Sequence, residues 1–412
     1  MFKPSSTYLT LKKSYSKNMP EYMAMRNKYY PEFVFEKNPR ISKNEIPVFT
    51  LHSVEPYQFE EQLDFLSRNH YQTLNADTFY ECLKGNQPVP ENAIVLTFDD
   101  GWESVWAVAY PLLKKYRFCA VCFLIPGLIR ESDCYSPNLE DFWSGKATLE
   151  EITRRVRGTE FLCSWKEIQK MDEAGTIDFQ SHSMYHSLIF TTSIIEDFIH
   201  PGFDFHSMNL NVPVFRENGT ENIFRIAQFG MPVYTSEPRM SGKRRYYDDI
   251  GLRMECIKYV KENGDIDYFK NRNWRRKLFS MVSEYRIKYG HVMRFESEEE
   301  QRENIFTDLS ESKRMIEKLI RGKTVNHLCY PWWSGSDLAV EMSQKSGYLT
   351  NFWGIDKERR TTNRVGDDPY RVCRFLGDDY IFRLPGEGRK SLRKILEEKL
   401  LNNYKGFINK IF

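Results

Sequence analysis

The sequence AIVLTFDDG, residues 93–101, decides the fold class of this chain. Its first six residues form a nearly continuous apolar run, which is typical of a strand buried on both faces of a parallel sheet. The run ends in Asp99, Asp100 and Gly101. In parallel α/β folds, ligands and catalytic groups gather at this carboxyl end. Asp-Gly also makes ordinary tight turns. Adjacent carboxylates repel unless a cation or proton relieves them, so we favour a functional pair.

The segments on either side of this run alternate β-rich stretches with amphipathic helical stretches. This order predicts βα units around a parallel sheet. Pro111 is expected to kink or divide one of the helices. The predicted strands are 46–54, 71–74, 120–125, 177–183, 325–331 and 348–354, and the predicted helices are 59–69, 76–84, 102–116, 164–175, 296–322 and 336–347.

We expect three parts along the chain. Residues 1–45 form an irregular N-terminal extension, and residues 46–388 form the main domain, interrupted by an insertion at about 191–295 that breaks the alternation. Residues 389–412 form a C-terminal amphipathic helix with an apolar stripe. Such a helix either docks on its own domain or lies in a membrane interface, where its lysines attract anionic lipid.

Composition limits the partners of this chain. The 59 basic residues nearly balance the 57 acidic ones, so no overall field would gather nucleic acid. Acidic residues also interleave the basic clusters at 243–245 and 272–277, which predicts no nucleic-acid partner. The N-terminus has no uninterrupted apolar segment of the secretory type, so we expect a cytoplasmic protein, with membrane contact only at the periphery through residues 389–412. The eight cysteines are then expected to be reduced thiols.

Two histidines follow another predicted strand. His182 and His186 are four residues apart, so on a helical turn both imidazoles would lie on one face and reach one metal ion. The pair would stand at the same rim of the sheet as Asp99 and Asp100. A carboxylate with two imidazoles and open coordination positions is typical of a hydrolytic metal site.

The motifs TFDDG (97–101) and H-S-x-x-H (182–186) resemble the first two motifs of the polysaccharide deacetylases, the fourth family of carbohydrate esterases. Residues 46–130, 163–190 and 300–376 are similar to that family as well. The resemblance implies an α/β fold, a distorted (β/α) barrel of the polysaccharide deacetylase type with a large insertion. It further implies that Asp99 is the catalytic base and that Asp100, His182 and His186 bind a divalent metal, usually zinc.

Two further segments carry weaker likenesses. Cys-Tyr-Pro-Trp-Trp at 329–333 loosely resembles the family's substrate loop, which implies substrate-binding roles for Tyr330, Pro331, Trp332 and Trp333. Tyr330 stands where many members have arginine. The two tryptophans either stack on a sugar ring or belong to the core. His52 also matches a family position near the site; the alternative is a hydrogen-bonded histidine at a strand end.

The chain departs from the family in its last motif. The family supplies a C-terminal histidine as general acid, but no histidine follows His327 in this sequence. Residues 370–376 resemble the strand that would deliver it, and they carry Arg374 instead. We therefore expect Arg374 to stabilise the oxyanion or to bind substrate. Proton donation is left to water or to a histidine of the insertion, such as His206 or His291.

These interpretations predict a metal-dependent hydrolase that removes an N-acetyl group from an amino sugar. The substrate would be a polysaccharide, an oligosaccharide or a lipid-linked glycan precursor. One alternative is an amidase acting on a non-sugar amide with the same residues. A second alternative is a non-catalytic carbohydrate-binding barrel, which the missing C-terminal histidine favours and the complete set of Asp99, Asp100, His182 and His186 opposes.

Overall fold

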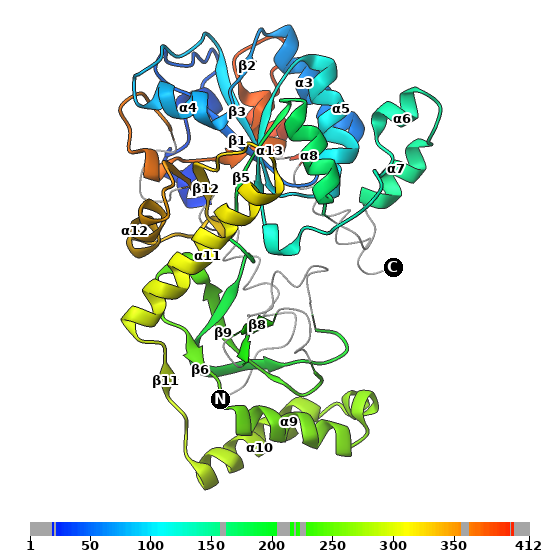
Figure 1. The fold of residues 1–412 in the computed structure, drawn as a ribbon, viewed down its shortest axis with the longest axis vertical. Coiled ribbons are helices and arrows are strands. Elements are labelled where there is room, and N and C mark those ends of the chain that lie inside the picture. Colours follow the sequence, from blue (N-terminus) through cyan, green and yellow to red (C-terminus); the bar gives the residue numbers. More distant parts are fainter. Residues whose placement is uncertain are drawn as a thin grey trace. The chain divides into compact units, whose positions relative to one another are not determined.

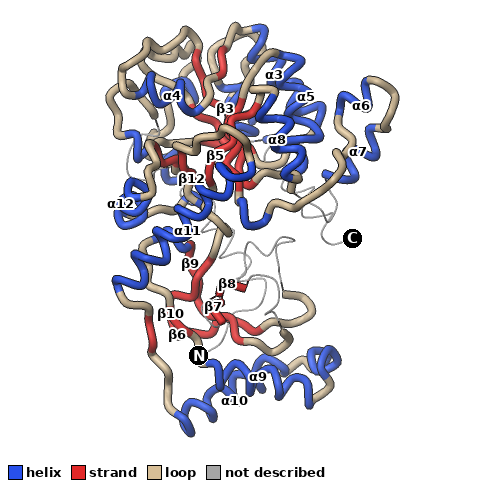
Figure 2. Tube along the Cα trace, viewed as in Figure 1, coloured by secondary structure: helices blue, strands red, loops and turns tan. Residues whose placement is uncertain are grey.

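The computed structural model describes most of the chain, namely residues 19, 22–156, 162–203, 215–217, 220–222, 228–355, 362–395 and 397–398. The chain divides into two compact units, which are drawn in Figures 1 and 2 and are described separately below. The first unit comprises Met1–His182, Ser312–Trp333 and Gly347–Phe412, and the second comprises Ser183–Glu311 and Ser334–Ser346. The predicted insertion at about 191–295 falls inside the second unit.

The first unit is built around one parallel sheet. Its strand order is β13–β12–β5–β4–β3–β1–β14, and β2 pairs with β3 beside this path. Each βα crossover returns the chain in the same direction, so all carboxyl ends lie at one rim. The strands are β1 (Val48–Leu51), β2 (Gln72–Thr73), β3 (Ala93–Asp100), β4 (Ala120–Leu124), β5 (Ile177–Ser181), β12 (His327–Cys329), β13 (Thr350–Phe352) and β14 (Phe375–Leu376).

The two ends of this sheet are joined by the segment that leads into β14. Val372 bridges in parallel to Phe352 of β13, and Phe375 then pairs with Phe49 of β1. The sheet therefore curls into a barrel. It is distorted, because β14 is only two residues long and a single bridge links its approach to β13. The predicted fold class is confirmed.

Helices cover the outside of the barrel. Figure 1 shows α3, α5 and α8 beside the sheet. Pro111 does not divide its helix: residues 103–116 are helical throughout, and a π-helical turn, Val105–Ala109, directly precedes α5, whose second residue is Pro111. The helices are α3 (Pro56–Arg68), α4 (Ala76–Leu83), α5 (Tyr110–Tyr116), α6 (Leu139–Trp143), α7 (Leu149–Val156), α8 (Trp165–Glu173) and α13 (Gly377–Tyr380).

The described ends of the chain contain regular structure. Within residues 1–45, α2 (Glu32–Phe35) forms a short helix, and the buried rings of Tyr30 and Phe33 pack against Phe375 of β14. This part is therefore not wholly irregular, because its aromatic side chains cover the closing strand. At the other end, residues 392–395 and 397–398 are helical. The rest of the predicted C-terminal helix lies outside the described residues.

The second unit has its own apolar core. Strands β6 and β9 pair antiparallel, as do β10 and β11, and α9 and α10 pack against them through residues such as Tyr234, Tyr246 and Leu278. The elements are β6 (Leu188–Phe198), β7 (Phe215–Glu217), β8 (Thr220–Asn222), β9 (Pro232–Pro238), β10 (Tyr246–Tyr247), α9 (Ile250–Glu262), α10 (Trp274–Tyr289), β11 (Arg294–Phe295) and α12 (Asp337–Lys345). Helix α11 (Glu298–Leu319) runs from the second unit into the first. Among the described residues, no helix has the length and apolar character needed to cross a membrane.

Candidate active site

The turn after β3 has an uncommon backbone. Asp100 has φ 72° and Gly101 has φ 86°, so two consecutive residues adopt the left-handed conformation. A side chain at position 101 would place its Cβ 2.7 Å from Leu124 Cδ2, so only glycine fits there. Left-handed backbone at a non-glycine residue is unfavourable and persists where the surroundings enforce it, often at functional sites. The conformation supports a functional role for the Asp99–Asp100 pair.

Asp99 is held by Arg374 in a buried, two-pronged ion pair. Arg374 Nη1 donates to Asp99 Oδ1 at 2.6 Å, and Nη2 donates to Oδ2 at 2.9 Å. Both side chains are buried, 2% and 0% exposed. Burial by itself would raise the pKa of Asp99, but the guanidinium charge outweighs it and holds that pKa well below its ordinary value. Asp99 is therefore ionised.

Two further N–H groups of Arg374 donate to the protein. Its Nη1 donates to Thr97 Oγ1 at 3.1 Å, and its Nε donates to the carbonyl oxygen of Trp353 at 3.1 Å. A fully buried guanidinium with these acceptors does not reach solvent. The structure therefore favours a positioning role, exerted through Asp99, over the predicted direct contact of Arg374 with an oxyanion or substrate.

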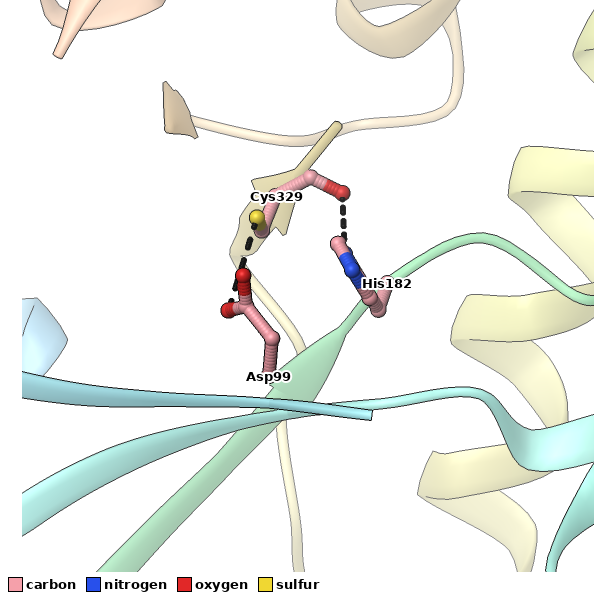
Figure 3. A group of neighbouring side chains, drawn as sticks. All are labelled: Asp99, His182 and Cys329. Carbon is pink, nitrogen blue, oxygen red and sulfur yellow. Dashed lines mark hydrogen bonds between the residues drawn. The ribbon is translucent and has the colours of Figure 1, made fainter. Parts of the chain in front are cut away.

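His182 follows β5 and is fixed in one tautomer. Its Nδ1 lies 2.9 Å from the carbonyl oxygen of Cys329 in β12, as Figure 3 shows. A carbonyl can only accept, so Nδ1 carries the proton and Nε2 presents its lone pair, the arrangement typical of metal-binding histidines. Burial lowers the pKa of His182 to about 4, which keeps the ring neutral. Nε2 lies 3.5 Å from Asp100 Oδ1.

Asp100 is a buried carboxylate whose negative charge a cation would stabilise. Its Oδ2 accepts a hydrogen bond from Trp102 Nε1 at 2.8 Å. Burial and the neighbouring charge of Asp99 together raise the pKa of Asp100 to about 7. A divalent ion would relieve both effects. A carboxylate oxygen beside a neutral imidazole nitrogen is a suitable donor pair for Zn²⁺, so Asp100 and His182 fit the predicted metal.

A second set of potential ligands lies close by. Asp99, His182 and Cys329 bring donor atoms within 4.8 Å of one another, and Figure 3 shows the three side chains facing each other. This set suits a metal less well. Both oxygens of Asp99 already accept hydrogen bonds from Arg374, and burial raises the pKa of the Cys329 thiol well above its ordinary value, so the thiol stays protonated. Asp100 and His182 are therefore the better candidate metal ligands.

The expected helical turn at 182–186 is wrong. These residues form a bend rather than a helix, with φ 65° at Ser183 and φ 55° at His186. His186 is buried, and its backbone N–H donates to Ser183 Oγ at 3.1 Å. The boundary between the two units falls after His182. His186 therefore belongs to the second unit, and its role as a metal ligand stays a prediction.

The predicted substrate residues are placed very differently from one another. Tyr330 is fully buried, its hydroxyl accepts a hydrogen bond from Asn351 Nδ2 at 2.7 Å, and Pro331 is buried beside it. These two side chains cannot stack on a sugar in this structure, so their predicted contact with substrate is not supported. Trp332 is 37% exposed and Trp333 is partly buried, both with positive φ. The substrate-binding role of the two tryptophans stays a prediction.

His52 lies on the solvent side of Asp99. Its ring is half exposed, and its Nε2 lies 4.0 Å from Asp99 Oδ2. This arrangement agrees with a position at the site rather than in the core. Of the two histidines considered as general acids, His206 lies outside the described residues, and His291 is an exposed residue of the second unit.

Several residues that shape the site were not assigned a role from the sequence. Thr97, Trp102 and Trp353 all bind a charged residue of the site, and Cys329 orients His182. Trp102 could have been suspected, because it directly follows the Asp-Asp-Gly sequence. Trp353 and Cys329 act through backbone carbonyls, which any residue type provides, so the sequence holds no signal for them.

An ionised aspartate next to a carboxylate–imidazole pair at the rim of a parallel barrel provides the groups of a hydrolase site. The family model described as polysaccharide deacetylase matches residues 86–197 of this chain. The chain is 26% identical over 131 residues to the poly-β-1,6-N-acetyl-D-glucosamine N-deacetylase of Escherichia coli K12, covering 32% of this chain and 18% of the relative. It is 29% identical over 133 residues to the enzyme of that name from Staphylococcus aureus, covering 32% and 37%. The matching part thus spans well under half of either relative.

Two solved structures are similar to this chain. A de-N-acetylase from Aggregatibacter actinomycetemcomitans has a TM-score of 0.47 at 18% identity, covering 81% of this chain and 95% of its own. The BpsB deacetylase domain from Bordetella bronchiseptica has a TM-score of 0.49 at 14% identity, covering 82% and 97%. The fold assignment itself rests on the strand pairings of the first unit.

Proposed function

We propose that this chain is a metal-dependent deacetylase that hydrolyses the N-acetyl group of an amino sugar in a polysaccharide, an oligosaccharide or a lipid-linked glycan. The observation that carries the proposal is the ionised, Arg374-clamped Asp99 beside Asp100 and the neutral His182. The names of the relatives support β-1,6-linked N-acetylglucosamine as the first substrate to test.

The residues of the site would have separate roles in the proposed reaction. Bound zinc would supply Lewis acidity toward the amide carbonyl and toward water. Asp100 and His182 would hold the ion, with His186 as the proposed third ligand. Asp99 would accept the proton of the attacking water, because Arg374 keeps the carboxylate ionised and fixes its orientation. His52 would face the incoming substrate at the solvent side of Asp99.

Acetate release tests this function. The purified full chain, loaded with Zn²⁺, is incubated with β-1,6-linked N-acetylglucosamine oligomers, and acetate and free amines are measured together. Equal amounts of both products are expected, and Asp99→Asn should lower turnover by about 10²- to 10⁴-fold, the usual contribution of a general base. A partly exposed acidic residue outside the candidate site, Glu60 of α3, provides the control Glu60→Gln, which should match the unaltered chain in turnover.

The same assay separates the alternatives. Release of acid from small non-sugar amides, without release from the sugar oligomers, would identify an amidase. Binding of the oligomers with no acetate release under any metal would identify a non-catalytic carbohydrate-binding barrel. Either result would refute the proposed function.

A further inference from the structure

The end of helix α10 exposes a group of large apolar side chains. Ile287 is 86% exposed, Tyr289 63%, Met293 59% and Val292 40%. We call these four residues the α10 tip. Figure 1 shows α10 beside α9, with β11 leaving the end of α10. Single exposed apolar residues are ordinary on protein surfaces, whereas four large ones between Ile287 and Met293 at one helix end make this end a candidate interaction surface.

Helix α9 extends the same apolar surface. At its start, Ile250 is 63% exposed and Met254 is 54% exposed. This start lies against the last turns of α10, because Tyr285 Oη donates to Asp249 Oδ1 at 3.5 Å. The start of α9 and the last turns of α10 therefore lie side by side within the second unit.

The tip is held in place by hydrogen bonds and ring contacts. The backbone N–H of Gly290 closes α10 by donating to Arg286 O at 3.0 Å, and Tyr246 Oη donates to Val292 O at 2.9 Å. Tyr246 belongs to the core of the second unit and packs on Phe295 of β11. The exposure of the tip is thus built into a fixed turn.

The polar residues interleaved with the tip are mainly basic. Lys288, His291 and Arg294 alternate with its apolar residues, and no acidic residue lies between Glu284 and Glu296 in the sequence. Glu296 is buried and bonded to Arg239, so it adds no surface charge. Two acidic residues near α9 partly offset this charge: Glu255 acts on Lys288, and Asp249 acts on His291. Lysine and arginine among exposed aliphatic and aromatic side chains are typical of segments that enter a membrane interface.

We propose that the α10 tip is a docking surface for an anionic lipid membrane, independent of the proposed deacetylation and of the C-terminal segment. Its apolar side chains would enter the boundary between headgroups and acyl chains, while Lys288 and Arg294 would contact lipid phosphates. A lipid surface suits the tip better than a protein partner. Together with Ile250 and Met254 of α9, the tip amounts to six exposed apolar residues. This is far fewer than the roughly 20 to 30 residues that each side of a stable protein interface uses.

Vesicle flotation with the full chain tests this inference. Vesicles of phosphatidylcholine containing about a third phosphatidylglycerol should carry the chain upward, and vesicles of phosphatidylcholine alone should carry less of it. The double variant Ile287→Ser/Tyr289→Ser should bind the anionic vesicles at least about tenfold more weakly, because it loses most of the apolar burial. Both positions are exposed, so the variant should fold normally, which thermal unfolding checks.

Two control chains separate membrane binding by the tip from binding by another part of the protein. Tyr57 of the first unit is 76% exposed, so Tyr57→Ser matches the loss of an exposed aromatic ring and should bind like the unaltered chain. A chain ending at Arg389 should also float. Equal flotation of the double variant and the unaltered chain would overturn the proposal. So would loss of flotation on truncation at Arg389, or a lower molecular mass of the double variant in lipid-free light scattering, which would indicate contact between copies of the chain.

Discussion

Replacing Arg374 with methionine should destabilise the first unit strongly. The change removes the positive charge and keeps an unbranched side chain in the same space. Asp99 would then be a buried carboxylate without its two hydrogen bonds of 2.6 and 2.9 Å. Neither side chain of the pair is exposed by more than 2%, so water does not screen the interaction or replace it. Removing one partner of such a pair costs about 3–5 kcal/mol.

The double variant Asp99→Asn/Arg374→Met should recover part of this loss. Asparagine carries no charge, so the pair no longer leaves an uncompensated ion in the core, and the two single changes should not add. Urea unfolding at pH 7, followed by tryptophan fluorescence, gives the free energy of unfolding for all four chains. Arg364 and Glu45 provide a matched, partly exposed ion pair in the same unit, and Arg364→Met should cost about 1 kcal/mol or less.

The proposed role of Arg374 would be refuted by two results. One is a free energy of unfolding for Arg374→Met within about 1 kcal/mol of that of the unaltered protein, since an unpaired buried carboxylate should destabilise the fold by more than this. The other is strict additivity of Asp99→Asn and Arg374→Met, which would mean that the two groups do not interact in solution.

Three further predictions concern the site and the second unit. His182→Ala should lower zinc affinity by at least about tenfold in a chelator competition, with His327→Ala as the control; equal affinities would remove His182 from the metal site. Burial would raise the pKa of Asp197, but the hydrogen bonds from His200 and Arg275 outweigh this effect and lower that pKa to about 2. The ionised carboxylate therefore adds up to about 2 kcal/mol to the free energy of unfolding above pH 4. This contribution is lost as the pH falls toward 2. Asp197→Asn should flatten that part of the pH–stability curve, and an unchanged curve would contradict the assignment. His291→Ala should retain full turnover if water is the proton donor, whereas a large loss would identify His291 as the general acid.

The sequence alone predicted the alternation of strands and helices around the sheet of the first unit, although it did not predict α6 and α7. The apolar run before Asp99 predicted a buried parallel strand, and the spacing of Phe59, Leu63 and Leu66 predicted helix α3. These features depend on residues close together in the chain, so periodicity reveals them. Pro111 did not divide its helix, because a π-helical turn before it keeps residues 103–116 helical throughout.

Only the tertiary structure decided how the site is held together. Arg374 lies 275 residues from Asp99 in the chain, and nothing in either sequence segment indicates that the two side chains form an ion pair. The tautomer of His182 depends on a backbone carbonyl of β12, which has no signature in the sequence. The burial of Tyr330 and the left-handed backbone at Ser183 also differ from the sequence-based expectations, because contacts with distant segments determine them. Residue types fix which chemistry is available, whereas the pairing of distant strands fixes which groups meet.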